Sequence, residues 1–132
     1  MMAVQLDHVI VHAHDRVASA RRLAELLGVP WSAGGGPGPF SAVYVNDSLT
    51  LDFDEMDGPF PVGHFAFQVS PERFDEILGR LQAAGIPWRS SPAGPVDRKV
   101  GTHGGGRLVY WDEPAGHIWE ILTVSYARRS EP

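Results

Sequence analysis

Two histidines stand at matching places in two similar stretches of this chain, residues 6–31 and 62–88. In each stretch a histidine, His8 or His64, lies among alternating apolar residues, and an amphipathic segment then leads to Gly-Val-Pro-Trp or Gly-Ile-Pro-Trp. Similarity over this length indicates two copies of one supersecondary unit. Because the two histidines occupy equivalent places, they could form the two sides of one metal site.

A carboxylate near the C-terminus completes this set of candidate ligands. Glu120 lies in the apolar run Ile-Trp-Glu-Ile-Leu, where a charged group is costly to bury without a partner. Two imidazoles and one carboxylate form the facial triad that binds Fe(II) and related ions and leaves positions open for substrate. A lone histidine in a strand is more often structural, but the matched positions and the glutamate favour a metal site.

The elements expected in the first copy follow from local patterns. Residues 5–11 alternate and predict a strand. Asp15 is a suitable N-cap and Gly28 a suitable end for the amphipathic helix that follows. Residues 40–45 and 48–54 predict a hairpin that turns at the Asn-Asp pair between them.

The second copy shows the same order. Residues 63–69 predict a strand, and Ser70, followed by proline, predicts a helix start. Residues 107–111 and 117–123 predict a second hairpin. The loop before it, residues 91–106, is rich in glycine and proline and is longer than a simple connection needs.

The chain is therefore expected to be an α+β protein of one domain, residues 1–128. Each copy, about 1–57 and 58–128, forms a strand, a helix and then two or three antiparallel strands. Two such mixed, curved sheets facing each other would enclose a cleft with polar lining, with the helices outside.

Composition narrows the classes of partner. The 132 residues carry a net charge of −5, a single lysine and no cysteine, which argues against nucleic acid or an anionic membrane as a partner. No window is long and apolar enough to span a bilayer, and the start lacks the pattern of a signal peptide. We expect a cytoplasmic protein that binds a small molecule.

Three segments of the chain resemble the vicinal oxygen chelate superfamily, which includes glyoxalase I, extradiol dioxygenases, and fosfomycin- and bleomycin-resistance proteins. They read LDHVIVHAHD, VGHFAFQVS and RLVYWDEPAGHIWEILT. The resemblance implies paired βαβββ modules, a homodimer, and a divalent ion (Fe, Mn, Ni, Co or Zn). It also implies the metal ligands His8, His64 and Glu120.

Glyoxalase I-like enzymes use a fourth ligand, a carboxylate on the first hairpin. A first hairpin that turns at the Asn-Asp pair places Thr50 opposite Val43, and a second that turns at residues 113–116 places Glu120 opposite Val109. Matching Val43 and the tyrosine after it to Val109 and Tyr110 then predicts that Thr50 corresponds to Glu120. Asp52 then lies two residues further on, roughly 6.5–7 Å along the strand. Threonine is a poor metal ligand, so this departure argues against glyoxalase I activity, and a His-His-Glu set instead matches dioxygenases and fosfomycin-type transferases.

Proton transfer beside the metal needs further groups, and Glu120 is joined by four other catalytic candidates: His12, Asp52, His103 and Tyr110. His12 shares a strand face with His8, and His103 lies on the glycine-rich loop, which could act as a lid. Asp52 could be a general base, accept a hydrogen bond from substrate, or pair with Arg107.

Two functions stay open. The first is a metal-dependent dioxygenase, lyase or isomerase that binds two adjacent oxygens of a small substrate, with the metal as Lewis acid. The second is a metal-free protein of the bleomycin-resistance type that sequesters an aromatic or cationic ligand, which the acidic charge and four tryptophans suit. The His-His-Glu set favours the enzyme. The fosfomycin-type reaction is weakly supported because few cationic groups are present.

Overall fold

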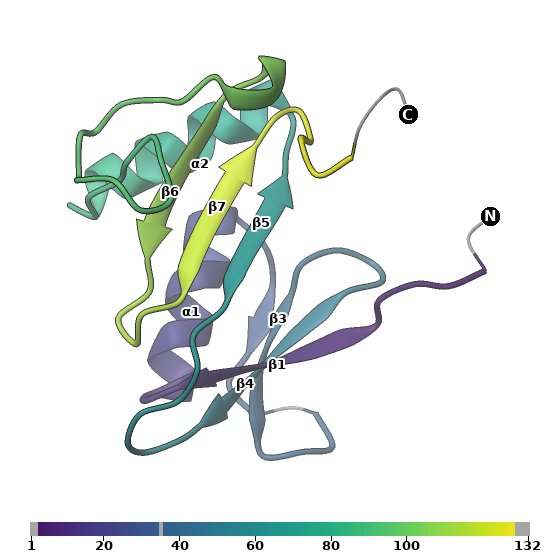
Figure 1. Cartoon of the computed structure of the whole chain (residues 1–132). Coiled ribbons are helices and arrows are strands. Elements are labelled where there is room, and N and C mark those ends of the chain that lie inside the picture. The colour runs from purple at the N-terminus through teal and green to yellow at the C-terminus, as the bar shows by residue number, and fades with distance from the viewer. Residues whose placement is uncertain (1–2, 35, 129–132) are drawn as a thin grey trace. The chain divides into compact units, whose positions relative to one another are not determined.

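The computed structural model describes residues 3–34 and 36–128, and these form two compact units. One unit ends at Pro61, and the other begins at Val62. Each unit contains one sheet and one α-helix (Figure 1). Within the described residues, no helix has the length and apolar character needed to cross a membrane.

The first unit is a four-stranded mixed sheet with one helix against it. The sheet order is β1-β4-β3-β2, with β1 parallel to β4 and the other neighbours antiparallel. The elements are β1 (His8–Ala13), α1 (Arg16–Leu27), β2 (Trp31–Ser32), β3 (Phe40–Tyr44) and β4 (Thr50–Glu55). The strand predicted at residues 5–11 therefore begins and ends later than expected.

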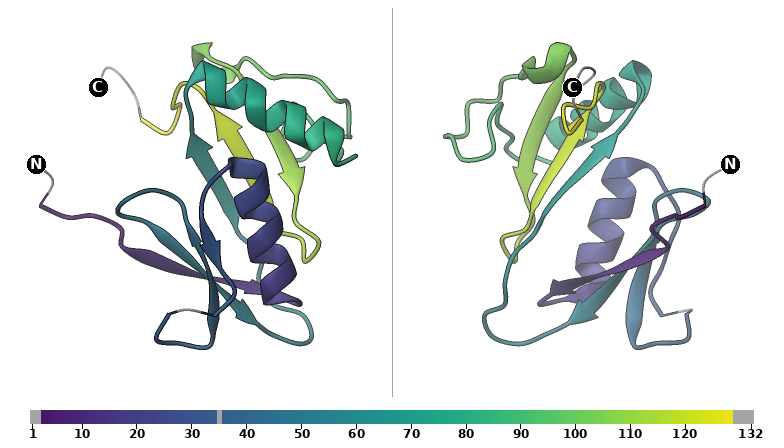
Figure 2. Two further views of the ribbon diagram at one scale, coloured as in Figure 1. Left: turned by 180° about the vertical axis from the view of Figure 1, so that it is seen from behind. Right: turned by 45° about the vertical axis from the view of Figure 1, so that its right-hand side comes forward.

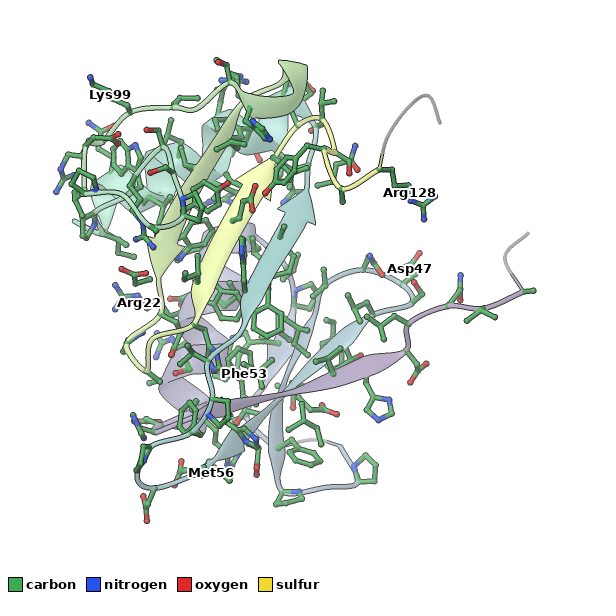
Figure 3. All side chains as sticks on the ribbon, in the orientation of Figure 1. Arg22, Asp47, Phe53, Met56, Lys99 and Arg128 are labelled. Carbon is green, nitrogen blue, oxygen red and sulfur yellow. The ribbon has the colours of Figure 1, made fainter. Side chains whose placement is uncertain are left out.

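Local signals set the limits of α1 as predicted. The side chain of Asp15 accepts a hydrogen bond from the backbone N–H of Ala18, 3.1 Å away, and Gly28 ends the helix at φ 74°. An N-cap carboxylate satisfies a backbone donor that the helix leaves free, and glycine adopts the left-handed conformation without steric cost. Alternation along β4 buries Leu51 and Phe53 and places Asp52 on the opposite face of the sheet. Phe53 is labelled in Figure 3.

The second unit is a three-stranded sheet in the order β5-β7-β6, with β5 parallel to β7. Helix α2 covers one face of this sheet (Figure 2), and Ser70 caps it through the backbone N–H of Arg73. The elements are β5 (His64–Gln68), α2 (Pro71–Ala83), the short 3₁₀ helix η1 (His103–Gly105), β6 (Leu108–Asp112) and β7 (Ile118–Leu122).

The two mixed sheets and two helices confirm the α+β class and the repeated order of elements. The units differ at one edge. In the first unit β2 pairs with β3, whereas in the second unit Arg89 forms only a single antiparallel bridge with Tyr110.

Charged side chains anchor the loop between α2 and β6. The guanidinium of Arg89 donates two hydrogen bonds of 3.0 Å to Asp112 and also donates to the carbonyl of Pro92. Asp97 accepts hydrogen bonds from the backbone N–H groups of Ser90 and Lys99, at 3.1 and 3.0 Å, and from the hydroxyl of Ser90. Lys99 marks the course of this loop in Figure 3.

Replacing Asp97 with asparagine is expected to change how stability depends on pH. The hydroxyl of Ser90 is the main cause that lowers the pKa of Asp97 below its ordinary value of 3.8. The ionised carboxylate therefore stabilises the fold above pH 3.8, and this contribution is lost as the pH falls through the lower, folded-state pKa. Urea unfolding at a series of pH values should show a difference between parent and Asp97→Asn at neutral pH that disappears in acid.

Asp47, at the exposed tip of the first hairpin (Figure 3), supplies the control. Asp47→Asn should change the free energy of unfolding much less than Asp97→Asn at neutral pH. A difference between parent and Asp97→Asn that is equally large at every pH would contradict this account of the loop.

Candidate functional site

In each unit, the face of the sheet that does not pack on the helix carries predicted site residues. In the first unit, His8 and Asp52 line an open hollow of about 580 Å³. In the second unit, His64 and Glu120 line one of about 400 Å³. The predicted ligands therefore lie at two separate hollows, one in each unit, and each hollow is called a half-site of the predicted ligand set.

The second unit brings two predicted ligands into direct contact. Glu120 is completely buried, while the side chain of His64 is 42% exposed. His64 Nε2 lies 2.8 Å from Glu120 Oε1, and because a carboxylate only accepts, the imidazole donates. The pair arises from register, since Glu120 on β7 is beside Ala66 on β5, two residues from His64 on the same face. An imidazole nitrogen and a carboxylate oxygen that meet at an open hollow fit a divalent metal.

Tyr126 also contacts Glu120, and sequence reasoning did not identify it. Its hydroxyl lies 2.7 Å from Oε1 and 2.8 Å from Oε2. Burial, followed by the hydrogen bonds to Tyr110 and Glu120, raises the pKa of Tyr126, so the hydroxyl stays protonated and donates. The residue lies after β7, in a segment with no repeat or periodic pattern, so nothing in the sequence indicated that it folds back onto β7.

Tyr110, a predicted catalytic residue, lies beside this pair. Its ring meets that of His64 edge to face at 5.8 Å, and its hydroxyl is 3.4 Å from that of Tyr126. It is buried, and this burial is the main reason why its pKa is raised. The structure therefore places Tyr110 near the second half-site, and its catalytic role stays a prediction.

His103 is exposed on η1, and its ring lies 4.9 Å from the ring of Tyr126. It is not among the residues that line the 400 Å³ hollow. His103 therefore contacts Tyr126, which lines the hollow, and does not line the hollow itself. The catalytic role of His103 and the lid motion of its loop stay predictions.

The first half-site is more exposed. Nδ1 of His8 lies 2.9 Å from Asp7 Oδ2, and this hydrogen bond is the main cause that raises the pKa of His8. Since the bond engages Nδ1, Nε2 is the atom that can bind a ligand. The hollow is lined by residues of β1, β3 and β4, by the residue before β1 and by the loop before β3: Asp7, His8, Gly36, Pro37, Gly38, Phe40, Ala42, Tyr44, Thr50 and Asp52.

His12 lies on the same face of β1 as His8, as predicted, but does not line the hollow. Its Nδ1 is 3.3 Å from Asp54 Oδ2, and its ring is 5.5 Å from the ring of Phe60. His12 and Asp54 are also register partners. His12 therefore interacts with Asp54, four residues along the strand from His8, and its catalytic role stays a prediction.

The strand register corrects the predicted match of Thr50 to Glu120. His8 is beside Thr50 in the first parallel ladder, and His64 is beside Ile118 in the second. Thr50 therefore corresponds to Ile118, and two residues further along each strand Asp52 corresponds to Glu120.

The hairpins give the same answer. Residues 45–49 join the first pair of strands and residues 113–117 join the second, so both connections have equal length. In the first hairpin Asp52 pairs with Ala42, and in the second Glu120 pairs with Tyr110. The predicted partner of Glu120, Val109, was wrong by one residue.

The turns explain the one-residue shift of the hairpin partners, whereas the match of Thr50 to Glu120 failed because Tyr44 corresponds to Asp112, the partner of Ile118, and not to Tyr110. Val45 N–H donates to Leu49 O, so the first turn contains three residues rather than the Asn-Asp pair alone. The side chain of Asn46 stabilises this wider turn by accepting from the backbone N–H groups of Ser48 and Leu49. The similarity between Val43-Tyr44 and Val109-Tyr110 does not reflect equivalent positions.

The possible pairing of Arg107 with Asp52 was also wrong. The guanidinium of Arg107 donates to Asp75 at 2.8 Å and lies over the ring of Phe74, both on α2. Arg107 is thus held on the helix side of its own sheet. Asp52 lines the hollow of the first unit instead.

The predicted metal set is divided between the units. Within the described part of either unit, no three histidine, aspartate or glutamate side chains come together closely enough to hold a metal ion. His64 and Glu120 supply two ligands in one unit, and His8 belongs to the other.

Solved structures of similar chains identify the family. A structure described as "Oxidase ChaP-H1" is 44% identical, with a TM-score of 0.87, and the match covers 96% of this chain and 100% of that one. "Oxidase ChaP-H2" is 40% identical, with a TM-score of 0.88, over 96% and 98% of the two chains. A lactoylglutathione lyase from Agrobacterium tumefaciens is 19% identical, with a TM-score of 0.67, over 90% and 92%, and so shares the fold.

The chain belongs to the vicinal oxygen chelate superfamily. Within it, the chain is similar over nearly its whole length to the two ChaP oxidases. No protein-family model and no curated protein matches it.

Proposed function

We propose that this protein is a metal-dependent enzyme of the glyoxalase/dioxygenase type that acts on a small molecule. One divalent ion (Fe, Mn, Ni, Co or Zn) is held by His8, His64 and Glu120. The observation that carries the proposal is the contact between His64 and the buried carboxylate of Glu120 at the edge of a hollow. The names of the two similar oxidases favour an oxidative reaction over a lyase or isomerase.

The chain's own groups have distinct tasks in this proposal. When bound, the metal supplies a Lewis acid for two adjacent oxygens of the substrate. His8, His64 and the Glu120 carboxylate would hold the ion, and the half-buried carboxylate of Asp52 would accept a proton or hydrogen bond from a substrate hydroxyl. Tyr110 limits access of water to the ring of His64.

The proposed ligand set takes His8 from the first unit and His64 and Glu120 from the second, and we infer a homodimer as the assembly. The two modules, about residues 1–57 and 58–128, form one domain of this superfamily. Whether His8 comes from the same chain or from a second copy does not change the ligand set.

Asp52→Asn is expected to retain metal. Asp52 occupies the position equivalent to Glu120, but its side chain is one methylene shorter, so we assign it to the substrate rather than to the ion. Titration of the metal-free variant with Mn²⁺, followed by electron paramagnetic resonance, should give a Kd within about 10-fold of the parent. Removing a group that supports a metal ligand typically costs about 10–100-fold, and Asp52, which is assigned to the substrate, should cost less than that. Thr50→Val, on the same strand face, is the matched control.

Loss of Mn²⁺ binding in Asp52→Asn but not in Thr50→Val would contradict this assignment. Asp52 would then be a fourth ligand, as in glyoxalase I-like enzymes, and the proposed division of tasks would be wrong.

Open coordination positions provide the test of the oxidative function. The protein loaded with Fe(II) without oxygen is treated with nitric oxide, which binds where oxygen would, and then with catechol, which offers two adjacent oxygens. We expect a high-spin Fe–nitrosyl signal in electron paramagnetic resonance that changes when catechol is added, since a facial triad leaves positions open for both. A protein that gives no such signal after loading would refute the oxygenase function.

A metal-free binding protein is the second candidate. Phe40 and Tyr44 line the 580 Å³ hollow together with the carboxylates of Asp7 and Asp52, and this combination suits a cationic aromatic ligand. Binding of such a ligand to a protein that takes up no metal would favour this candidate.

A further inference from the structure

Glu120 has few groups that can fix its orientation. It is completely buried on β7, and within the described part of the chain His64 and Tyr126 lie within 2.8 Å of its carboxylate oxygens, while Tyr110 also takes part in a side-chain hydrogen bond with it. His64 contacts Oε1, whereas Tyr126 contacts both oxygens. If His64 Nε2 binds a metal, it no longer carries the proton that it donates to Oε1. Tyr126, whose hydroxyl lies 2.7 and 2.8 Å from the two oxygens, is then the main donor that still holds the carboxylate.

Tyr126 is itself held by the glycine-rich loop. The ring of His103 meets its ring edge to face at 4.9 Å. A Cβ atom on Gly104 would lie 2.9 Å from the Cβ of Tyr126, and Gly104 has a φ of 79°. Because any side chain at this position would clash and would also strain the backbone, the close approach depends on glycine.

Further contacts hold the segment after β7, which carries Tyr126, against the loop and the sheet. A Cβ on Gly106 would come within 2.6 Å of Thr123 Oγ1 and 2.9 Å of Val124 Cβ. The ring of Tyr126 also packs against the buried cluster of Leu108, Tyr110 and Leu122. The segment after β7 therefore packs between the glycine-rich loop and the sheet. Glycines at residues 104–106 allow this close packing, which is a structural role separate from the predicted lid motion.

We propose that Tyr126 is a positioning residue for the metal ligand Glu120, and that the loop at residues 103–106 holds Tyr126 in place. The hydroxyl keeps one carboxylate oxygen hydrogen-bonded, so that Glu120 presents the other oxygen to the ion. This inference rests on the proposed metal site. It assigns a role to Tyr126 and to the glycine-rich loop that the ligand set alone does not include.

The test measures metal affinity and coordination, not turnover. Metal-free parent and Tyr126→Phe are titrated with Zn²⁺ by calorimetry and with Co²⁺ by visible absorption. The variant keeps the ring and loses only the hydroxyl. We expect its Kd to rise about 10–100-fold, the usual range when a group that supports a metal ligand is removed, and its Co²⁺ absorption bands to shift because Glu120 changes its binding mode.

Two further variants keep the result interpretable. Thr123→Val removes a nearby hydroxyl that accepts from the backbone N–H of Arg107, and its Kd should stay within about twofold of the parent. Gly104→Ala displaces Tyr126 without removing its hydroxyl, and its Kd should also rise. This second route tests the proposal even if Tyr126→Phe does not fold.

Each outcome decides a different point. If the parent binds Zn²⁺ and Co²⁺ and Tyr126→Phe binds them equally well with unchanged bands, the positioning role is wrong and the metal site stands. Equal loss in Thr123→Val and Tyr126→Phe would also overturn it. If the parent binds neither ion, the proposed function fails, and the positioning role fails with it.

Discussion

Glu120→Gln is expected to weaken metal binding by about 100-fold or more and to leave the fold intact. Glutamine keeps the shape of the side chain, and its amide oxygen can still accept hydrogen bonds from His64 and Tyr126. It loses the negative charge that a divalent ion needs, and removing a ligand should cost at least as much as the 10–100-fold lost with a supporting group. Calorimetric titration of the metal-free proteins with Zn²⁺ measures the change.

Glu113→Gln is the matched control. Glu113 is also a buried glutamate of the second unit, but its carboxylate accepts a hydrogen bond from the backbone N–H of Ala115 in the turn before β7. We expect Zn²⁺ affinity in this variant to match that of the parent. Equal affinity in Glu120→Gln and the parent would remove the basis for the metal site, whatever the behaviour of the control.

Phe74→Ala is expected to lower the free energy of unfolding by about 3–5 kcal/mol, the usual cost of truncating a buried phenylalanine. Phe74 is fully buried on α2, together with Ile77 and Leu81. The guanidinium of Arg107 lies 4.5 Å from the centre of its ring. Truncation leaves a cavity under the helix that covers the sheet carrying Glu120. Urea unfolding monitored by circular dichroism measures the loss.

The control for this prediction is Val96→Ala, since Val96 is 53% exposed in the same unit. Such surface changes usually alter stability by less than about 0.5 kcal/mol. A loss below about 1 kcal/mol in Phe74→Ala would show that α2 contributes little packing energy to this unit, contrary to the burial described here.

Much of the fold could be predicted because local signals decide it. Asp15, Gly28 and Ser70 mark helix ends through hydrogen bonds and backbone conformations that depend only on neighbouring residues. The alternation around His64 and Glu120 also sets which side chains share a face of the sheet. These signals need no knowledge of the rest of the chain.

Register was harder to predict because a turn of one extra residue shifts every pair in a hairpin. Asn46 draws two backbone N–H groups into a wider turn, and this moved the partner of Thr50 from Val43 to Tyr44. The equivalence of Asp52 and Glu120 was concealed by a separate error, the alignment of Val43-Tyr44 with Val109-Tyr110, because the residue that corresponds to Tyr110 is Ala42. Both parallel ladders start at the matched histidines, so aligning the two copies on His8 and His64 gives the correct equivalence of Asp52 and Glu120.

The contact between Tyr126 and Glu120 could not be predicted for a different reason. It depends on how the chain folds back after β7 and on the space that Gly104 leaves for Tyr126. Neither feature has a periodic or compositional signature. Contacts that depend on backbone clearance between two loops become visible only in the folded structure.

The most direct test of the central claim is elemental analysis of protein purified without a His-tag and without oxygen, then reconstituted and dialysed. The parent should hold about one equivalent of Fe, Mn, Ni, Co or Zn per chain, the stoichiometry of a three-ligand site. Separate His8→Ala, His64→Ala and Glu120→Gln variants should lose that metal while remaining folded by circular dichroism. A parent without metal after reconstitution, or a His8→Ala protein that retains a full equivalent, would contradict the proposed site.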